Sequence, residues 1–269
     1  MKNAVRWIRL PAAADWREVV WPKEHGSWSL AFEPLAFGLL AAPSPGGAWL
    51  GAAVALAFFA RRPLRIAWRD ASPEQRVTAW GALAVCGVGA AAALFGAIAV
   101  GGVGWLVWLG PAAIGGAIFL WFDLQNAGRE AVAEVAGAAA FATLPAALAT
   151  LAGWPPATAL ALAVVMIGRS VPAVLTVRAA LRHAKTGEFH RAPALIAAGA
   201  FLAAGIWLAD AWIAPRLAVL ALAVLTLRTI FLLVYPRPQL RARTIGMIET
   251  VLGLAFVVAV ALANWPVLG

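Results

Sequence analysis

Apolar residues fill this chain in long stretches that do not alternate with polar residues as they would in a strand. The run GALAVCGVGAAAALFGAIAVGG at 81–102 is typical. A bilayer core about 30 Å thick takes about 20 mostly apolar residues per helical crossing, and the backbone inside it must satisfy its own hydrogen bonds. These stretches therefore predict membrane-spanning α-helices.

Turn-forming segments divide the apolar stretches into nine expected spans. The breaks include APSPGG at 42–47, GWPP at 153–156 and YPRP at 235–238, whose Pro and Gly residues favour turns. The expected spans are 26–42, 48–62, 77–100, 103–123, 128–151, 157–181, 192–210, 213–235 and 244–265. The first two are short for a straight crossing.

The connections are too short for a soluble module, so residues 1–269 are expected to form a single polytopic domain. The prediction is an all-α membrane protein with nine transmembrane helices in one bundle. Residues 1–22 mix Arg6, Arg9 and Arg17 with apolar residues. That mixture is typical of a basic amphipathic segment on the inner membrane surface or of a flexible cytoplasmic tail.

Composition agrees with a membrane protein, because the chain is 63% hydrophobic and 12% charged where soluble domains average about 45–50% and 25%. Of 21 Lys and Arg residues, only Arg216 falls in an outer connection if the amino terminus is cytoplasmic. The positive-inside rule then puts the carboxyl terminus outside. Anionic inner-leaflet lipid accounts for the net charge of +9, so membrane lipids are expected partners and nucleic acid is not.

Glu33, Arg169, Arg228 and Glu249 are charged residues that lie too deep in expected spans to belong to the connections. A charge at the bilayer centre costs about 2.5–3.5 kcal/mol and usually faces the bundle interior or a partner. Arg228 and Glu249 lie at similar depth on consecutive spans, which makes them candidate partners. The alternative is that Arg228 extends its stem to the inner surface while Glu249 is interfacial.

The first span carries His25, Ser29 and Glu33 at i, i+4 and i+8, which places them along one helix face. This face predicts one wall of a cytoplasm-facing polar cavity. The alternative is that His25 marks the interface and Glu33 bonds a neighbour. Gly168 and Pro172 flank Arg169 and are expected to interrupt the sixth span and to line the same cavity.

Arginine and glutamate pairs mark the inner ends of other spans. Glu130 and Glu134 share a face, for which pairing with arginines is expected rather than metal binding. Arg65 with Arg69, and Arg178 with Arg182, repeat the i, i+4 spacing four spans apart, as a parallel internal repeat would. Such pairs suit bidentate recognition of an anion, although lipid headgroups explain them equally well.

Several motifs resemble the YwiC-like family of bacterial membrane proteins. These are PKEHGSWSLAFEPLAFG at 22–38, RPL at 62–64, REAVAEVAG at 129–137, VRAALR at 177–182 and IGMIETVLG at 245–253. The resemblance covers most of the chain and implies a multi-pass protein of the bacterial cell membrane. The resemblance does not indicate which reaction, if any, the protein catalyses, and it does not identify a cofactor.

The nine-span topology is also similar to the UbiA superfamily of intramembrane prenyltransferases. Those enzymes carry Asp-rich motifs in the second and sixth inner connections, where carboxylates hold magnesium ions on a diphosphate. Here Asp70 stands alone after the second span, and no aspartate accompanies Arg178 and Arg182. Either arginines bind the anion directly, or the scaffold has lost transferase chemistry and serves in binding or transport.

The favoured hypothesis is a cavity that binds an amphipathic anionic ligand, isoprenoid or quinone-related, with prenyltransferase-like chemistry as an extension. His25 or Glu33 would handle a proton. The expected anion ligands are Arg65, Arg69, Arg169, Arg178, Arg182 and Arg228, oriented by Glu130, Glu134 and Glu249, with no metal. The expected lining is formed by spans 26–42, 128–151, 157–181, 213–235 and 244–265. The alternatives are a small-anion or proton-coupled transporter, with Glu33, Arg228 and Glu249 as a relay, and an assembly partner of a membrane complex.

Overall fold

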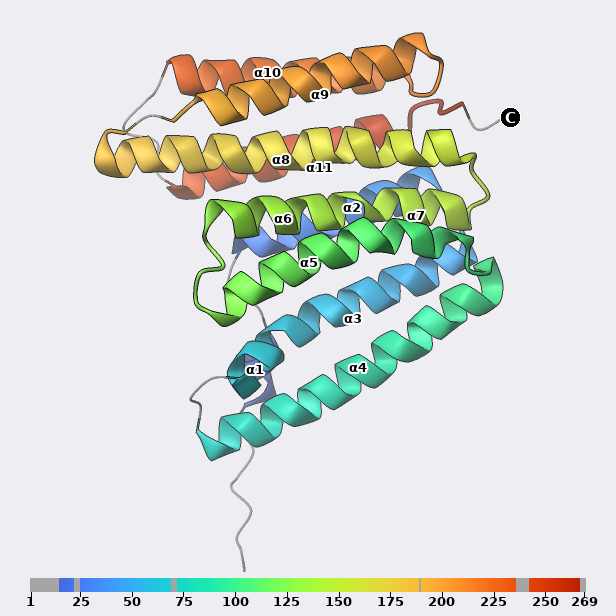
Figure 1. Cartoon of the computed structure of the whole chain (residues 1–269), viewed down its shortest axis with the longest axis vertical. Helices are drawn as coiled ribbons and strands as arrows, with labels where there is room; N and C mark the ends of the chain where they lie inside the picture. The colour runs from blue at the N-terminus through green and yellow to red at the C-terminus, as the bar shows by residue number, and fades with distance from the viewer. Residues whose placement is uncertain (1–14, 22–24, 69–71, 189, 236–241, 267–269) are drawn as a thin grey trace, which may run out of the picture.

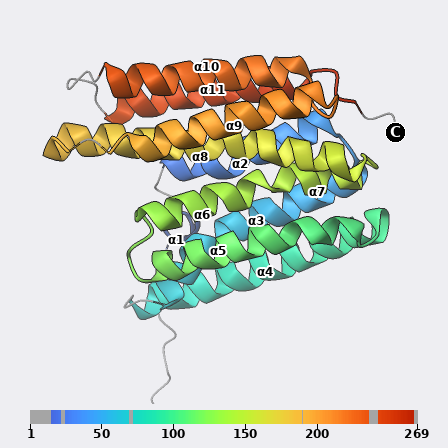
Figure 2. The same ribbon diagram turned by 45° about the horizontal axis from the view of Figure 1, so that its top comes forward.

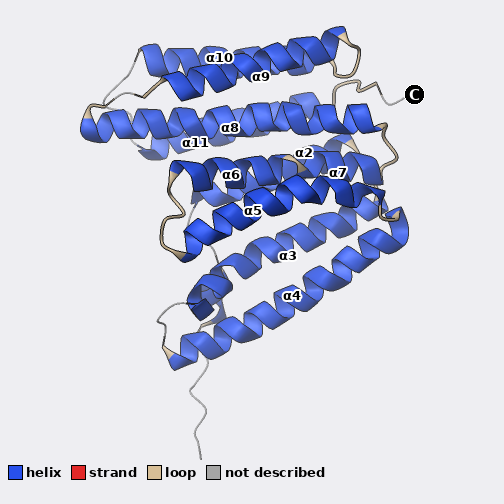
Figure 3. Cartoon of the chain, viewed as in Figure 1, coloured by secondary structure: helices blue, strands red, loops and turns tan. Residues whose placement is uncertain are grey.

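The computed structural model describes residues 15–21, 25–68, 72–188, 190–235 and 242–266, without the side chains of 25–27, 242 and 243. Helices dominate the described chain, and no strand occurs in it (Figure 3). They are α1 Trp16–Val20, α2 His25–Ala41, α3 Pro45–Trp68, α4 Pro73–Gly101, the 3₁₀-helix η1 Gly104–Trp108, α5 Leu109–Leu124, α6 Ala131–Ala142, α7 Leu144–Leu151, α8 Pro156–Thr186, α9 Ala192–Asp210, α10 Arg216–Val234 and α11 Ala242–Ala261.

Each of the nine expected spans overlaps a helix of the structure. Seven helical segments of the described chain are long and apolar enough to cross a membrane: α4, η1 with α5, α6 with α7, α8, α9, α10 and α11. The first two expected spans, α2 and α3, fall outside this group. The apolar part of α2 is short, Trp28–Ala41, and the second half of α3 carries Arg61, Arg62 and Arg65.

The structure corrects several expected boundaries. α3 continues to Trp68 instead of residue 62, and α8 continues to Thr186 instead of residue 181. Arginine and lysine are good helix formers, so a helix can extend beyond the apolar run that predicts it. The expected span 128–151 is divided at Thr143, because Pro145 has no N–H to complete the helical ladder.

The long helices lie side by side, and the chain direction alternates from each to the next (Figures 1 and 2). α2, α6, α7 and α8 occupy the middle of the bundle, with α4 against α3 at one edge and α9 with α10 at the other (Figure 1). The main apolar core joins Phe37 of α2, Leu162 and Met166 of α8, and Phe256 of α11. This packing brings α2, α8 and α11, which are distant in sequence, into direct contact.

The short helix α1 packs on the protein itself. The side chain of Asp15 caps it by accepting a hydrogen bond from the N–H of Arg17 at 2.9 Å, and Val19 is buried. α1 contacts α3 and α4. Residues 1–14 and residue 22 of the expected amphipathic or flexible segment 1–22 lie outside the described residues.

Candidate functional site

The charged residues of four helices lie at a common depth in the bundle. Arg169 is thirteen residues from the start of α8, Arg228 twelve from the start of α10, and Glu249 twelve from the end of α11. At 1.5 Å per residue, each is about 18–20 Å from the same end of the bundle. Glu33 lies at the middle of α2, eight residues from either end. The set therefore lies well inside the bundle.

These four side chains form one buried ion-pair network with alternating charge. Glu33 Oε2 lies 3.2 Å from Arg169 Nη2, and Arg169 Nη1 lies 3.8 Å from Glu249 Oε2. Glu249 also pairs with Arg228. The side chains are only 4–13% exposed. The predicted pairing of Arg228 with Glu249 is confirmed, and Glu33 points into the bundle as expected.

Local sequence supports the network on both sides of Glu33. The hydroxyl of Ser29, one helical turn earlier, donates a hydrogen bond to Glu33 Oε1, which confirms the predicted relation between these two positions. Gly253 of α11 leaves the space that the network occupies, because a Cβ there would meet the Glu33 carboxylate and the Arg169 guanidinium. The side chain of His25 lies outside the described residues.

The network leaves several buried polar atoms without a hydrogen bond in the described part of the chain. They are Arg169 Nε, Arg228 Nε and Nη2, and both carboxylate oxygens of Glu249. Arg169 Nη2 is satisfied by the backbone carbonyl of Glu249 at 3.0 Å. Arg228 Nη2 and Glu249 Oε1 nevertheless form the ion pair of these two residues. Buried polar atoms are usually paired, so the Nε–H groups of Arg169 and Arg228 are the ones free to donate to a ligand or to water.

A small pocket opens beside these guanidinium groups. It lies between α8, α9 and α10 and is lined by Gly168, Arg169, Pro172, Ala173, Ala198, Leu225, Thr226, Arg228 and Thr229. Its volume is about 10 Å³, which is room for about one water molecule. α8 and α10 of the expected lining contribute to this pocket, and α9, which was not expected, also does; α2, α6, α7 and α11 do not.

Pro172 shapes this pocket without breaking α8. The structure corrects the expected interruption, since α8 is continuous from Pro156 to Thr186. Pro172 has no N–H to donate to the carbonyl of Gly168 one turn earlier, and both residues line the pocket. One turn after Pro172, the hydroxyl of Thr176 donates a hydrogen bond to the carbonyl of Pro172 at 2.6 Å. The same hydroxyl lies 3.2 Å from the hydroxyl of Thr229 on α10.

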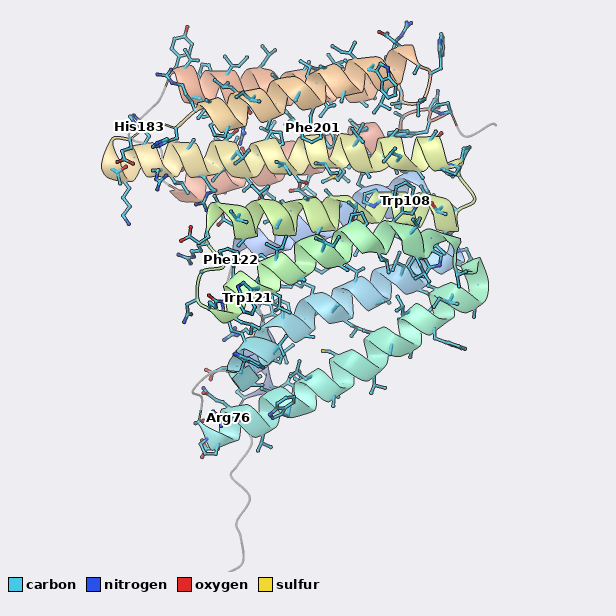
Figure 4. All side chains as sticks on the ribbon, viewed as in Figure 1. Arg76, Trp108, Trp121, Phe122, His183 and Phe201 are labelled. Atoms are coloured by element: carbon cyan, nitrogen blue, oxygen red, sulfur yellow. The ribbon has the colours of Figure 1, made fainter. Side chains whose placement is uncertain are left out.

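A second ion pair joins α6 and α8 at the end of the bundle that holds His183 (Figure 4). Arg178 Nη1 lies 2.6 Å from Glu134 Oε2 and also donates to the carbonyl of Arg129. The expected pairing of Glu134 with an arginine is therefore confirmed. Glu130 and Arg182 are exposed near this pair.

A third group joins α3 and α5 at the same end, where Trp121 and Phe122 also lie (Figure 4). Arg61 donates to both carboxylate oxygens of Asp123, at 3.0 and 3.1 Å, and its guanidinium lies 4.5 Å from the Phe119 ring centre. Arg65 lies 3.5 Å from the same carboxylate. Arg69 lies outside the described residues. Arg65 and Arg178 thus pair with different carboxylates and do not share one site.

Sequence reasoning missed Asp123 and Arg61. The available signal was position, because Asp123 ends a span on the side where the arginines of the preceding inner connection also lie. Among the described residues, no cluster of three or more His, Cys, Asp or Glu side chains could hold a metal ion. What the arrangement offers chemically is a buried pair of guanidinium groups balanced by two carboxylates.

Comparison with known proteins supports the family resemblance. The model of a family described as YwiC-like protein matches residues 21–149, which confirms the expected resemblance over that part of the chain. No curated protein and no solved structure matches the chain. The seven long apolar helices, together with this match, indicate a multi-pass integral membrane protein.

Proposed function

We propose that this YwiC-like membrane protein binds the anionic headgroup of an amphipathic ligand at Arg169 and Arg228. One observation carries the proposal: Arg169, whose side chain is 4% exposed and whose Nε has no hydrogen bond with the described residues, lines a pocket together with Arg228. Guanidinium groups suit carboxylate and phosphate anions because they donate several hydrogen bonds in one plane.

The pocket excludes a whole lipid, because its volume of about 10 Å³ is room for about one water molecule. An anionic headgroup would have to widen the pocket to lie beside the hydroxyls of Thr226 and Thr229. An isoprenoid or quinone-related tail would then lie in the bilayer beside α9 and α10, where Ile196, Leu220 and Leu227 are exposed. A ligand of this kind would reach the site from the side, between helices.

The same proposal includes a topology of nine crossings in a bacterial cell membrane, which the position of α2 and α3 alongside the seven apolar segments supports (Figure 1). The proposed amino terminus is cytoplasmic, because Lys and Arg then lie almost entirely on the inner side. The main apolar core, with Phe37, Met166 and Phe256, lies on the outer side of the charged network. Dry packing there favours a site that opens inward over a channel through the bundle.

A free small anion is the rival source of the same chemistry, because the pocket would accept it equally well. The test uses purified protein in phosphatidylcholine nanodiscs and calorimetric titration with two probes, decanesulfonate and methanesulfonate. Tight binding of decanesulfonate alone supports an amphipathic ligand. Equal binding of both indicates a free-anion site, and binding of neither overturns the proposal.

Two variants locate the binding. Arg228→Gln should weaken decanesulfonate binding at least about tenfold, because a lost charged hydrogen bond is worth about 1.5–3 kcal/mol. Arg228→Lys keeps the charge and should recover part of the affinity. Arg216→Gln removes the same charge from the exposed start of the same helix and should change nothing. Equal effects of Arg216→Gln and Arg228→Gln would contradict the assignment.

A further inference from the structure

We infer that the anion enters this pocket together with a proton, which the side chain of Glu249 takes up. The inference rests on the proposed function, because it concerns the same pocket. It goes beyond that function in making the site a proton-coupled one and in naming the residue that carries the proton.

The charge balance of the network carries the first step. Glu33 and Glu249 contribute two negative charges, and Arg169 and Arg228 contribute two positive charges, so the buried set is neutral. An added anion would leave one uncompensated negative charge among side chains that are 4–13% exposed. Uncompensated buried charge is strongly unfavourable. One proton bound with the anion restores neutrality.

Contacts within the network select Glu249 as the proton acceptor. Glu33 Oε1 accepts a hydrogen bond from Ser29, and its Oε2 lies 3.2 Å from Arg169. Glu249 pairs with Arg228, and its Oε2 lies 3.8 Å from Arg169. An anion that takes over Arg228 therefore leaves Glu249, and not Glu33, without its nearest ion-pair partner, and one proton removes the charge left behind.

The surroundings of Glu249 on every element packed against it agree with this choice. α2 contributes Glu33, α8 contributes Arg169 and α10 contributes Arg228. On α11 itself, Thr250 is exposed and bonds the carbonyl of Gly246. The side chains of Arg243 on α11 and His25 on α2 lie outside the described residues. Glu249 is thus the described carboxylate in contact with Arg228, the guanidinium that the anion would take over.

The proposed exchange balances in charge and in bonds. The Glu249 carboxylate accepts one proton and becomes a neutral acid, and the Arg228 ion pair is transferred from Glu249 to the incoming anion. Arg169 remains fixed, because it is held by Glu33 and by the backbone carbonyl of Glu249 at 3.0 Å, which protonation of the side chain does not alter. The network therefore stays neutral and anchored while Arg228 changes partner.

Decanesulfonate is a suitable probe because the sulfonate does not titrate near neutral pH, so any pH dependence belongs to the protein. In phosphatidylcholine nanodiscs its affinity should fall up to about tenfold per pH unit over the range where free Glu249 is ionised. Calorimetry in two buffers with different ionisation enthalpies should report about one proton taken up per anion bound.

Variants assign the proton to its residue. Glu249→Gln mimics the protonated acid, so it should bind decanesulfonate at high pH at least as tightly as wild type and with no proton uptake. Ser29→Ala removes the hydrogen bond that Glu33 accepts and leaves the charge of the network unchanged, so it should retain the pH profile of the wild-type protein. If Glu249→Gln fails to fold, as judged by size-exclusion chromatography, the proton count of the wild-type protein and the Ser29→Ala profile decide.

The outcomes separate this inference from the proposed function. Decanesulfonate binding without pH dependence or proton uptake overturns the coupling and leaves the binding site standing. A pH profile that Ser29→Ala shifts, or proton uptake that Glu249→Gln retains, overturns the choice of Glu249. Absence of decanesulfonate binding at every pH overturns the proposed function and this inference with it.

Discussion

Glu33, Arg169, Arg228 and Glu249 stabilise one another only as a set. Removing one member of a buried pair leaves a charge uncompensated, which costs about 3–5 kcal/mol in proteins. Ser29 and the carbonyl of Glu249 add hydrogen bonds that hold Glu33 and Arg169 in place. The sequence allowed these residues to be identified, because a charge inside an apolar span must find a partner.

Gly253 should be necessary for this arrangement. In Gly253→Ala the new methyl group would meet the Glu33 carboxylate and the Arg169 guanidinium, and we expect destabilisation of about 1–3 kcal/mol from overpacking. Thermal unfolding in detergent should show a melting temperature lower by at least about 3 °C. Gly246→Ala is the matched control on the same helix, since a Cβ at Gly246 has no neighbour within 4 Å. Equal melting temperatures for the two variants would refute the close packing.

Asp123 should hold α3 to α5. Asp123→Asn removes the charge that Arg61 and Arg65 share, and we expect a loss of about 1–3 kcal/mol in unfolding free energy, because the remaining guanidinium is left poorly paired. The comparison is Asp210→Asn, the same change at an exposed position at the end of α9. Thermal unfolding of both variants measures the difference. A melting temperature of Asp123→Asn no lower than that of Asp210→Asn would show that the group is dispensable.

At the scale of helices, the apolar runs predicted where the elements lie but did not predict which faces meet. α8 and α10 are apolar almost all round, so no periodic stripe marks an inward face. On α2 and α11, the inward face was marked by a charged residue, Glu33 and Glu249 respectively. Nothing in the pattern marked Ala198 of α9, which lines the pocket beside Arg169 and Arg228. Likewise, the ends of α3 and α8 lie beyond the apolar runs, because arginine and lysine are hydrophilic and interrupt the apolar pattern but still favour a helix.

Adjacent glycines on α5 provide a test of helix packing. A Cβ at Gly115 would lie 2.7 Å from the carbonyl oxygen of Ala136 and 3.0 Å from the Cβ of Ala140, so α5 and α6 approach closely at this point. Gly115→Ala should force the helices apart and cost about 1–3 kcal/mol. Gly116→Ala changes the next residue, where a Cβ has no neighbour within 4 Å. Thermal unfolding should therefore rank Gly115→Ala well below Gly116→Ala, and the reverse order would contradict the contact.

For the whole molecule, the asymmetric distribution of positive charge is the main support for orientation. The ends that hold Arg178, Lys185 and the Asp123 group lie on one side of the bundle (Figure 1), and Arg216 lies at the other. The positive-inside rule places the basic side in the cytoplasm. Dropping α2 and α3 together would preserve the orientation of every later helix, so orientation alone does not determine whether these two helices cross.

The turn between α2 and α3 distinguishes nine crossings from seven. With Cys86 replaced by alanine, Pro43→Cys should react with a membrane-impermeant maleimide added to intact spheroplasts, because two full crossings expose residue 43 outside. Ala211→Cys, between α9 and α10, should react in the same way, whereas Gln125→Cys should react only after permeabilisation. All three positions are exposed in the structure. A Pro43→Cys protein that stays unlabelled from outside while Ala211→Cys is labelled would mean that α2 and α3 do not cross. Glu33, at the middle of α2, would then lie nearer the inner surface, and the depth shared by the four charged residues would have to arise from a tilt of α2 rather than from a crossing.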